Sequence, residues 1–198
     1  MKAYYEQRAP EYDEWYYGGG QFGARSRPGW SEEVRALTGA LEALAPASTL
    51  DVACGTGFLS RHLPGVVVGL DQSAAMLREF ERRLPAATTV AADALESLPF
   101  PDGAFDRVFA AHFYGHLRPQ ERARFLAEAR RVVAAELVVV DSVLRDDVEP
   151  ESVQQRVLND GSRWEVYKRY FTPEALGAEL DGGRVLFAGD WFLAVVSG

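Results

Sequence analysis

Gly55 and Gly57 lie in the segment Asp51–Gly57, which follows a short apolar run and precedes a helical stretch. Glycine lets the backbone approach a ligand closely, and the first N–H groups of a helix are free to bind polar ligand atoms. A glycine pair with this spacing is weak evidence by itself. Ser60 stands where a dinucleotide-binding loop would have a third glycine, and the loop lacks the lysine of a phosphate-binding loop. The turn therefore indicates close backbone contact with a ligand but does not favour a phosphate cradle.

Three acidic residues accompany this turn. Asp51 lies just before it, Asp71 ends the next apolar run, and Asp93 ends the run after that. Ligands bind at the carboxyl ends of parallel strands, where an acid in the position of Asp71 can accept hydrogen bonds from both hydroxyls of a ribose. Three acids beside one glycine turn suit a cationic nucleoside better than a pyrophosphate.

Two histidines follow the fourth apolar run, in the sequence His112-Phe-Tyr-Gly-His116. Histidine is the side chain most readily poised for proton transfer near neutral pH. We expect both at the mouth of a pocket, His116 as a general base and His112 as a substrate or cofactor contact, although either could be a packing residue. Their spacing could bind a metal on a helix, but Gly115 interrupts the helix and no acidic ligand lies near, so no metal site is expected.

The elements that must position these residues alternate between strands and helices, and such alternation predicts a doubly wound parallel sheet. Ser31 is expected to cap the helix that precedes the first strand. The expected strands are residues 49–53, 66–70, 88–92, 105–111 and 136–143, and the expected helices are residues 31–44, 58–63, 73–84 and 119–133.

The pattern changes after residue 144. Residues 145–169 are polar and mixed, and residues 167–170 are expected along the far wall of the pocket. A capped helix is expected over 172–180, followed by two apolar runs, 184–190 and 191–196, that form an antiparallel pair. The predicted fold class is α/β, with a doubly wound, mostly parallel seven-stranded sheet of Rossmann-like type and a C-terminal antiparallel hairpin.

Composition limits the classes of function. The chain has 198 residues, 47% of them hydrophobic, and a formal net charge of -8, which indicates one globular domain over residues 1–198 and argues against broad nucleic-acid binding. Cys54 is the single cysteine, so a disulfide framework is excluded. No apolar run reaches 18 residues, and the N-terminus is charged and lacks the apolar stretch of a signal peptide. A cytoplasmic protein that binds no membrane is expected.

The N-terminal residues are rich in aromatic side chains and charges. Short helices are expected over 2–8 and 10–16, followed by a glycine-rich, mobile connection. We interpret residues 1–29 as a lid over the site, hinged at the glycines, with Tyr16 as a substrate contact. The alternative is a hydrophobic flap over a sheet edge. Arg25 and Arg27 are either anion contacts or solvated charges.

The successive segments DVACGTGFLS, GLDQSAAML, AADALESLPFPDGAFDRVFAAHFYGHL and ELVVVDS resemble the motifs of class I S-adenosylmethionine-dependent methyltransferases in order, spacing and strand context. The resemblance extends through the YFTPEAL helix and the closing hairpin, so it covers residues 30–198. It implies S-adenosylmethionine as cofactor and a methyl group transferred by in-line displacement. Because the chain has no large inserted recognition domain, a small-molecule acceptor is expected.

The resemblance also implies roles for individual residues. Gly55 and Gly57 would pass under the methionine part of the cofactor, with Asp51 near its ammonium group, and Asp71 would bind the ribose hydroxyls. The implied adenine contacts and methyl neighbour are Gln72 and Met76 against the ring, Asp93 on the exocyclic amine, Ala94 through its backbone N–H, and Ala110 beside the methyl group.

The segment YYEQRAPEYDEWY resembles the lid of small-molecule members of this family. Tyr5 and Tyr12 would then help to close the site, Tyr12 against the cofactor and Tyr5 as the second candidate for a general base. Two other functions stay open: a nucleotide-dependent oxidoreductase on a similar sheet, and a non-catalytic cofactor-binding protein or partner subunit. The missing third glycine and the antiparallel hairpin count against the oxidoreductase.

Overall fold

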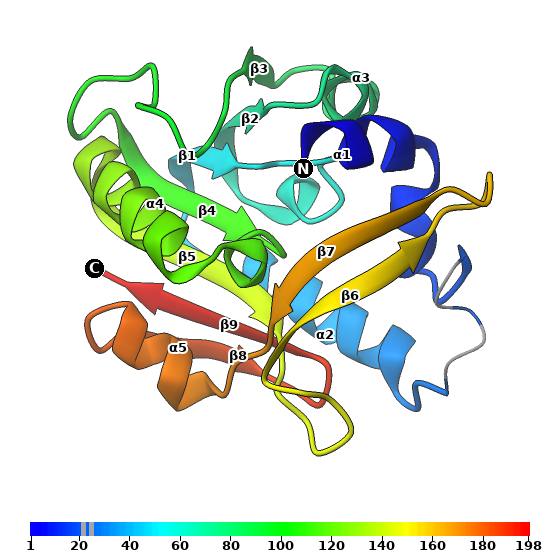
Figure 1. The fold of residues 1–198 in the computed structure, drawn as a ribbon. Coiled ribbons are helices and arrows are strands. Elements are labelled where there is room, and N and C mark those ends of the chain that lie inside the picture. The colour runs from blue at the N-terminus through cyan, green and yellow to red at the C-terminus, as the bar shows by residue number, and fades with distance from the viewer. Residues whose placement is uncertain (21–22, 24–25) are drawn as a thin grey trace.

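The fold is built on a seven-stranded sheet with the strand order β3-β2-β1-β4-β5-β9-β8, seen in a computed structural model that describes residues 1–20, 23 and 26–198 (Figure 1). Strands β1 to β5 pair in parallel, whereas β9 is antiparallel to both β5 and β8. The strands are β1 Ala47–Val52, β2 Gly65–Asp71, β3 Thr88–Ala91, β4 Phe105–Ala111, β5 Val133–Ser142, β8 Arg184–Ala188 and β9 Phe192–Ser197. The predicted fold class is confirmed.

The interior strand β5 is buried on both faces of the sheet. Leu137 and Val139 pack into one hydrophobic cluster, and Val138 and Val140 pack into another on the opposite face. Side chains alternate between the two faces of a strand, so a strand with both faces covered is apolar along most of its buried length.

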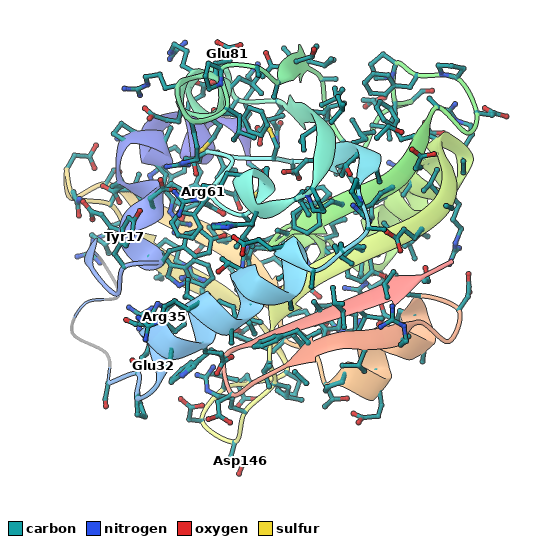
Figure 2. All side chains as sticks on the ribbon, turned by 180° about the vertical axis from the view of Figure 1, so that it is seen from behind. Tyr17, Glu32, Arg35, Arg61, Glu81 and Asp146 are labelled. Atoms are coloured by element: carbon teal, nitrogen blue, oxygen red, sulfur yellow. The ribbon has the colours of Figure 1, made fainter. Side chains whose placement is uncertain are left out.

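Helices cover both faces of the sheet. Helices α4 (Pro119–Val132) and α5 (Pro173–Glu179) pack into one cluster, and α2 (Trp30–Glu42) and α3 (Ala74–Arg83) pack into the other. Figure 2 shows α2 crossing the back of the sheet, with Glu32 and Arg35 at the surface.

The capping residue predicted for helix α2 is wrong. Helix α2 begins at Trp30 rather than after Ser31, and the capping residue is Gly29, whose φ of 73° is left-handed. The Trp30 side chain is buried and its indole N–H donates to the Tyr16 carbonyl at 2.9 Å. Because this ring is buried, Trp30 belongs to the first turn of α2. The polar residues around Trp30 in the sequence do not suggest its burial.

The helix expected over 58–63 is also wrong, because the structure has only a short 3-10 helix there, η3 Ser60–His62. The Ser60 hydroxyl donates to Asp51. Pro64 follows immediately after Leu63 and limits any extension of the helix. The glycine turn is therefore not followed by an α-helix N-terminus, and its polar groups come from the turn itself.

Residues 145–169, which were given no secondary structure, contain a β-hairpin. Strands β6 (Glu151–Val157) and β7 (Arg163–Arg169) pair antiparallel in a separate two-stranded sheet. Asp160 and Gly161 are a recognised hairpin-turn pair, and Gly161 has a φ of 84°. In Figure 1 this hairpin crosses the molecule from the β8–β9 side toward the N-terminal helices.

The N-terminal residues form α1 (Lys2–Arg8) and the 3-10 helix η1 (Ala9–Trp15), close to the two short helices expected. Part of the glycine-rich connection expected to be mobile, together with Arg25, lies outside the described residues. Within the described part of the chain, the structure has no helix with the length and apolar character needed to cross a membrane.

Candidate active site

The glycine turn after β1 takes a left-handed backbone at three of its residues. The φ angles are 57° at Ala53, 54° at Gly55 and 72° at Gly57. A Cβ added at Gly57 would lie 2.7 Å from the Phe80 ring, whereas one at Gly55 would meet only the Tyr12 ring, at 3.9 Å. Gly57 is therefore required for packing against α3, while Gly55 faces Tyr12. The left-handed φ of Ala53 is uncommon for a residue other than glycine, and the sequence alone carries no signal for it.

Asp51 is a buried acid with one oxygen unpaired. Its Oδ2 accepts from the Ser60 hydroxyl, whereas Oδ1 is buried without a hydrogen-bond partner among the described residues. Burial, with a smaller contribution from nearby Asp71, raises the Asp51 pKa to about 8 despite the Ser60 bond. A buried, unsatisfied carboxylate oxygen is costly unless a cationic or donor group occupies the space beside it. Asp51 therefore fits the ammonium group of a ligand.

Asp71 is fixed at the end of β2 by two backbone donors. Gly55 N–H donates to Oδ2 at 3.0 Å, and Ser73 N–H donates to Oδ1 at 2.8 Å. Burial raises the Asp71 pKa, while these backbone bonds oppose the change. Each carboxylate oxygen has a further lone pair, so an acid held this way can still accept from two hydroxyl groups.

The remaining candidate cofactor contacts lie along the same edge. Met76 and Ala94 are buried, whereas Gln72 is half-buried. Asp93 is exposed, and its Oδ1 accepts from Leu95 N–H at 3.0 Å as part of a turn. Because β2 and β3 are parallel neighbours with Asp71 opposite Ala91, Asp93 follows on the same side of the sheet as Asp71. The turn role of Asp93 is observed, and its contact with adenine stays a prediction.

The N-terminal segment is fastened over the glycine turn by acids that sequence reasoning did not single out. Asp13 accepts from the Thr56 hydroxyl at 2.6 Å and forms an ion pair with Arg83 on α3. Glu6 accepts from the backbone N–H groups of Ala74 and Ala75 at 2.6 and 3.2 Å. The free N–H groups at the start of a helix favour such a carboxylate. The sequence pattern carries no signal for these contacts, because the partners are about 43 to 70 residues away along the chain.

A cavity of about 780 Å³ opens at the carboxyl ends of β4 and β5. His112, His116 and Ser142 line it from the sheet side, and the N-terminal segment and the β6–β7 hairpin line the other walls. Tyr12 borders this cavity and also a much smaller hollow, of about 10 Å³, that contains Asp51. The Asp51 hollow and the large cavity therefore adjoin at the Tyr12 side chain.

His112 is strained and buried at the end of β4. Its φ is 52°, its side chain is 7% exposed, and neither ring nitrogen has a hydrogen-bond partner in the described part of the structure. Its ring lies edge-on to Trp15 with centroids 4.6 Å apart. Burial lowers the His112 pKa to about 3, so the ring is neutral. A left-handed non-glycine residue with buried, unpaired ring nitrogens fits a contact with a bound molecule.

His116 belongs to the 3-10 helix η4 (Tyr114–His116) and is held in one orientation. Its Nδ1 lies 2.7 Å from the Tyr167 carbonyl oxygen. A carbonyl can only accept, so Nδ1 carries the hydrogen and Nε2 keeps a lone pair. Burial and then the Lys168 ammonium lower the His116 pKa to about 3. The geometry suits a base at Nε2, but the ring is a weak base in this state.

The tyrosines of the N-terminal segment have different positions. Tyr5 and Tyr12 line the cavity, and burial raises the pKa of both phenols well above the ordinary value. Both phenols therefore stay protonated, which disfavours Tyr5 as a base and suits hydrogen-bond donation. Tyr16 stacks on Phe58, with centroids 3.8 Å apart, and lines the Asp51 hollow rather than the large cavity.

Two further expectations concern the ends of the strands. Ala110 is fully buried in the core cluster under α4, and it is Ala111 that lines the Asp51 hollow. Of the residues expected along the far wall, Lys168 and Tyr170 line the cavity. Tyr167 instead supplies the carbonyl that orients His116.

Comparison with known proteins finds relatives in sequence and in structure. A family model described as "Methyltransferase domain" matches residues 50–139. The demethylmenaquinone methyltransferase of Thermus thermophilus is 42% identical over 118 residues, which are 54% of this chain and 52% of that protein. The enzyme of the same name from Thermotoga maritima is 39% identical over 93 residues, which are 44% of this chain and 39% of that protein. The chain therefore spans about half or less of the length of these curated relatives.

Solved structures match over nearly the whole chain. The DhpI-SAM-HEP complex has a TM-score of 0.78 and 27% sequence identity, and the match covers 99% of this chain and 95% of that one. The DhpI-SAH complex has a TM-score of 0.74 and 26% identity, with coverage of 98% and 92%. The β6–β7 hairpin and the N-terminal segment thus fall within the range matched by these structures.

Proposed function

We propose that this chain, which resembles class I S-adenosylmethionine-dependent methyltransferases, transfers a methyl group from S-adenosylmethionine to a small-molecule acceptor. The observation that carries the proposal is the buried Oδ1 of Asp51, which has no partner among the described residues and lies in a hollow adjoining the large cavity. A cationic amino-acid group fits the hollow, and an acceptor fits the cavity.

The proposed cofactor contacts follow the glycine turn and the carboxyl ends of β2 and β3. Asp51 would receive the ammonium group, Gly55 would pass beneath the methionine part, and Asp71 would accept from the ribose hydroxyls. The adenine would rest among Gln72, Met76, Asp93 and Ala94. S-adenosylmethionine supplies an activated methyl group on a positively charged sulfur. The protein therefore has mainly to bind, orient and keep water out.

The N-terminal segment would keep water out. Glu6 and Asp13 hold this segment on α3 and on the glycine turn, and Tyr12 closes the boundary between hollow and cavity. Exclusion of water strengthens the electrostatic interactions inside a site. We propose residues 1–29 as a lid within a single domain of residues 1–198.

His112 and His116 would act on the acceptor. His112 offers two ring nitrogens to the cavity side of β4, and His116 offers Nε2, held by the Tyr167 carbonyl. Where the acceptor is a hydroxyl or amine, Nε2 of His116 would take its proton. Tyr5 would then donate a hydrogen bond, since its raised pKa keeps the phenol protonated.

The small-molecule acceptor is supported by the size of the cavity and by relatives. A volume of about 780 Å³ is in the range of small-ligand pockets. Related proteins are named for small molecules, among them the 2-methyl-6-phytyl-1,4-hydroquinone methyltransferase of Synechocystis, 36% identical over 118 residues. We further propose a cytoplasmic protein that acts without a nucleic acid or membrane partner.

Calorimetric titration of the purified chain tests the proposal. S-adenosylhomocysteine should bind at one site, NAD should not bind, and Asp71→Ala should weaken binding by about tenfold or more because charge-assisted hydrogen bonds are lost. Binding of NAD without binding of S-adenosylhomocysteine would favour the oxidoreductase. Tight binding with no methylated product from any compound in a broad acceptor panel, read by mass spectrometry, would favour a non-catalytic protein.

A further inference from the structure

Asp141 is a fully buried carboxylate near the end of β5, directly before Ser142, which lines the cavity. Its Oδ1 accepts from the Lys168 ammonium on β7 and from the Ser142 N–H at 2.8 Å. Its Oδ2 accepts from the Gly115 N–H on η4 at 2.7 Å. Although burial opposes it, the Lys168 ammonium holds the Asp141 pKa below its usual range, so the group is ionised. One carboxylate thus joins β5, β7 and η4.

The hydrogen bond that orients His116 joins two of these same elements. His116 is on η4, and its Nδ1 donates to the carbonyl oxygen of Tyr167 on β7 at 2.7 Å. His116 directly follows Gly115, and Tyr167 directly precedes Lys168. Asp141 therefore binds the neighbour of the donor and the neighbour of the acceptor. The geometry of this hydrogen bond depends on a carboxylate that belongs to neither residue.

Gly115 lets η4 come this close to the carboxylate. A Cβ added there would lie 2.8 and 2.9 Å from the two Asp141 side-chain oxygens and 2.7 Å from the Arg169 carbonyl oxygen. The φ of Gly115 is not left-handed, so close approach, and not backbone conformation, is what requires glycine here. Any larger residue would push η4 away from both β5 and β7.

The bond to Tyr167 matters because it selects the tautomer of His116. Burial and then the Lys168 ammonium lower the His116 pKa to about 3, so the ring is neutral near pH 7. A neutral imidazole has one nitrogen that donates and one that accepts. While Nδ1–H is held by the carbonyl, the lone pair stays at Nε2. Without this bond the other tautomer would be populated, and its Nε2–H could not take a proton.

We propose that Asp141 is a positioning residue for His116, because it holds η4 and β7 at the separation that the hydrogen bond from Nδ1 to the Tyr167 carbonyl requires. Asp141 acts through His116 and does not touch the acceptor. The inference rests on the proposed function, since His116 is the group that would take the proton of the acceptor.

Nitrogen NMR of the full chain with ¹⁵N-labelled histidine tests this inference without an acceptor. The chain has three histidines, and the signals lost in His116→Gln identify those of His116. Near pH 7 the Nδ1–H tautomer should exceed the other about tenfold in the wild-type chain, because a hydrogen bond stabilises it. Asp141→Asn should give a mixture of tautomers, since the charge that holds Lys168 is lost. A mixture in the wild-type chain, or an unchanged ratio in Asp141→Asn, would overturn the inference.

Gly115→Ala repeats the test without a change of charge. It should also give a mixture of tautomers, since the added Cβ would displace η4 from Asp141. Gly39→Ala is the matched control, because a Cβ at Gly39 on α2 meets nothing within 4 Å. Asp190→Asn, an exposed position before β9, is the control for the lost charge. Both controls should keep the wild-type ratio, and a mixture in either of them would contradict a role specific to Asp141.

The amide spectrum separates loss of orientation from loss of fold. Asp141→Asn and Gly115→Ala should keep dispersed amide signals throughout the sheet, with changes confined to η4, β7 and the end of β5. Lys168→Arg, which keeps a cation opposite Asp141, should keep the wild-type ratio, and a mixture in this variant would count against the inference. If Asp141→Asn does not fold, Gly115→Ala and Lys168→Arg decide the question.

Kinetics connects the orientation of His116 to the reaction. With an acceptor found in the panel, Asp141→Asn should lower kcat about tenfold with little change in KM. In a His116→Ala background the same substitution should lower kcat by less than about twofold more, because the residue that Asp141 positions is gone. Effects that multiply fully in the double variant would contradict a role exercised through His116.

The failure of this inference differs from the failure of the proposed function. If no acceptor is methylated, the proposed function fails, while the NMR ratios still decide whether Asp141 orients His116. If a product forms but Asp141→Asn changes neither the tautomer ratio nor kcat, the positioning role alone fails.

Discussion

Asp51 and Asp71 are two neighbouring buried acids. Ionising either of them places a negative charge in a crevice that is shielded from water. Burial raises both pKa values, that of Asp51 to about 8. A cation placed beside Asp51 would restore its ionised form. The energetics of this pair thus favour a ligand with a positive charge over one with a phosphate, which agrees with the sequence reasoning about the three acids.

The affinity for S-adenosylhomocysteine should depend on pH through Asp51. Below its pKa of about 8 the acid is mostly protonated in the ligand-free protein, so pairing with an ammonium group must release a proton. Affinity should therefore rise with pH between 6 and 8, by up to about tenfold per pH unit, and calorimetry in two buffers should show proton release. In Asp51→Asn the affinity should be lower and this rise should be lost. Affinity that falls with pH, or proton uptake on binding, would contradict this role.

His116 gives the second prediction at this scale. If Nε2 takes the acceptor's proton, His116→Ala should lower kcat by roughly 100-fold with little change in KM. His62→Ala, on η3 and outside the cavity, is the control and should leave kcat unchanged. A small effect of His116→Ala would make this histidine a packing residue.

Among the elements, the N-terminal segment is held by polar contacts in addition to the packing of its aromatic side chains. Asp13 is its link to both Thr56 and Arg83, and Glu6 holds it to the start of α3. Loss of one polar contact should therefore loosen the segment in part, while Tyr16 stays packed in its core cluster.

Asp13→Ala should loosen the segment selectively. Amide hydrogen exchange over residues 2–15 should become faster, and the affinity for S-adenosylhomocysteine should fall about tenfold, since the loss of a charged hydrogen-bond partner costs about 1.5–3 kcal/mol. Glu32→Ala, which removes an exposed acid paired only weakly with Arg35 on α2, should change neither quantity. Exchange that is uniform over the chain, or unchanged in Asp13→Ala, would rule out a separate closing segment.

Most of the helices and strands could be predicted from the sequence, but not all of them. Alternating apolar runs were sufficient for β1 to β5, for α3 to α5 and for the closing hairpin, because burial on both sheet faces leaves a strong pattern. The β6–β7 hairpin was missed, since it buries only one face and its strands read as polar, although the Asp160-Gly161 turn was a usable signal. The predicted helix over 58–63 is longer than the 3-10 helix η3 that the structure has, because Ser60 binds Asp51.

The candidate site could be predicted from the sequence only in part. Residues at strand ends, such as Asp71 and His112, follow from the order of the elements. Contacts made across the fold, such as Glu6 on α3 or Asp13 with Arg83, depend on tertiary packing and leave no local pattern.

At the scale of the molecule, one buried ion pair joins the main sheet to the hairpin. Asp141 at the end of β5 pairs with Lys168 on β7, and its Oδ2 also accepts from Gly115 N–H at 2.7 Å. The Lys168 ammonium holds the Asp141 pKa below its usual range against the opposing effect of burial. This pair fixes the hairpin over the cavity.

Lys168→Met should lower the free energy of unfolding by about 3–5 kcal/mol, because it leaves a buried carboxylate without its cation. In this variant the folded-state Asp141 pKa would rise above its unfolded value. The variant should thus lose stability as pH increases, and the loss should be larger at pH 8 than at pH 5 in urea unfolding. The double variant Asp141→Asn, Lys168→Met should recover part of the stability. A single variant with wild-type stability at both pH values would show that the pair does not hold the hairpin.

A crystal structure of the chain with S-adenosylhomocysteine tests the central claim most directly, because it shows whether hollow and cavity form one active site. We expect the ammonium group at Asp51 Oδ1, the ribose hydroxyls on Asp71, and the sulfur facing the cavity that His112 and His116 line. A nucleoside bound away from Asp71, or a sulfur turned away from this cavity, would contradict it.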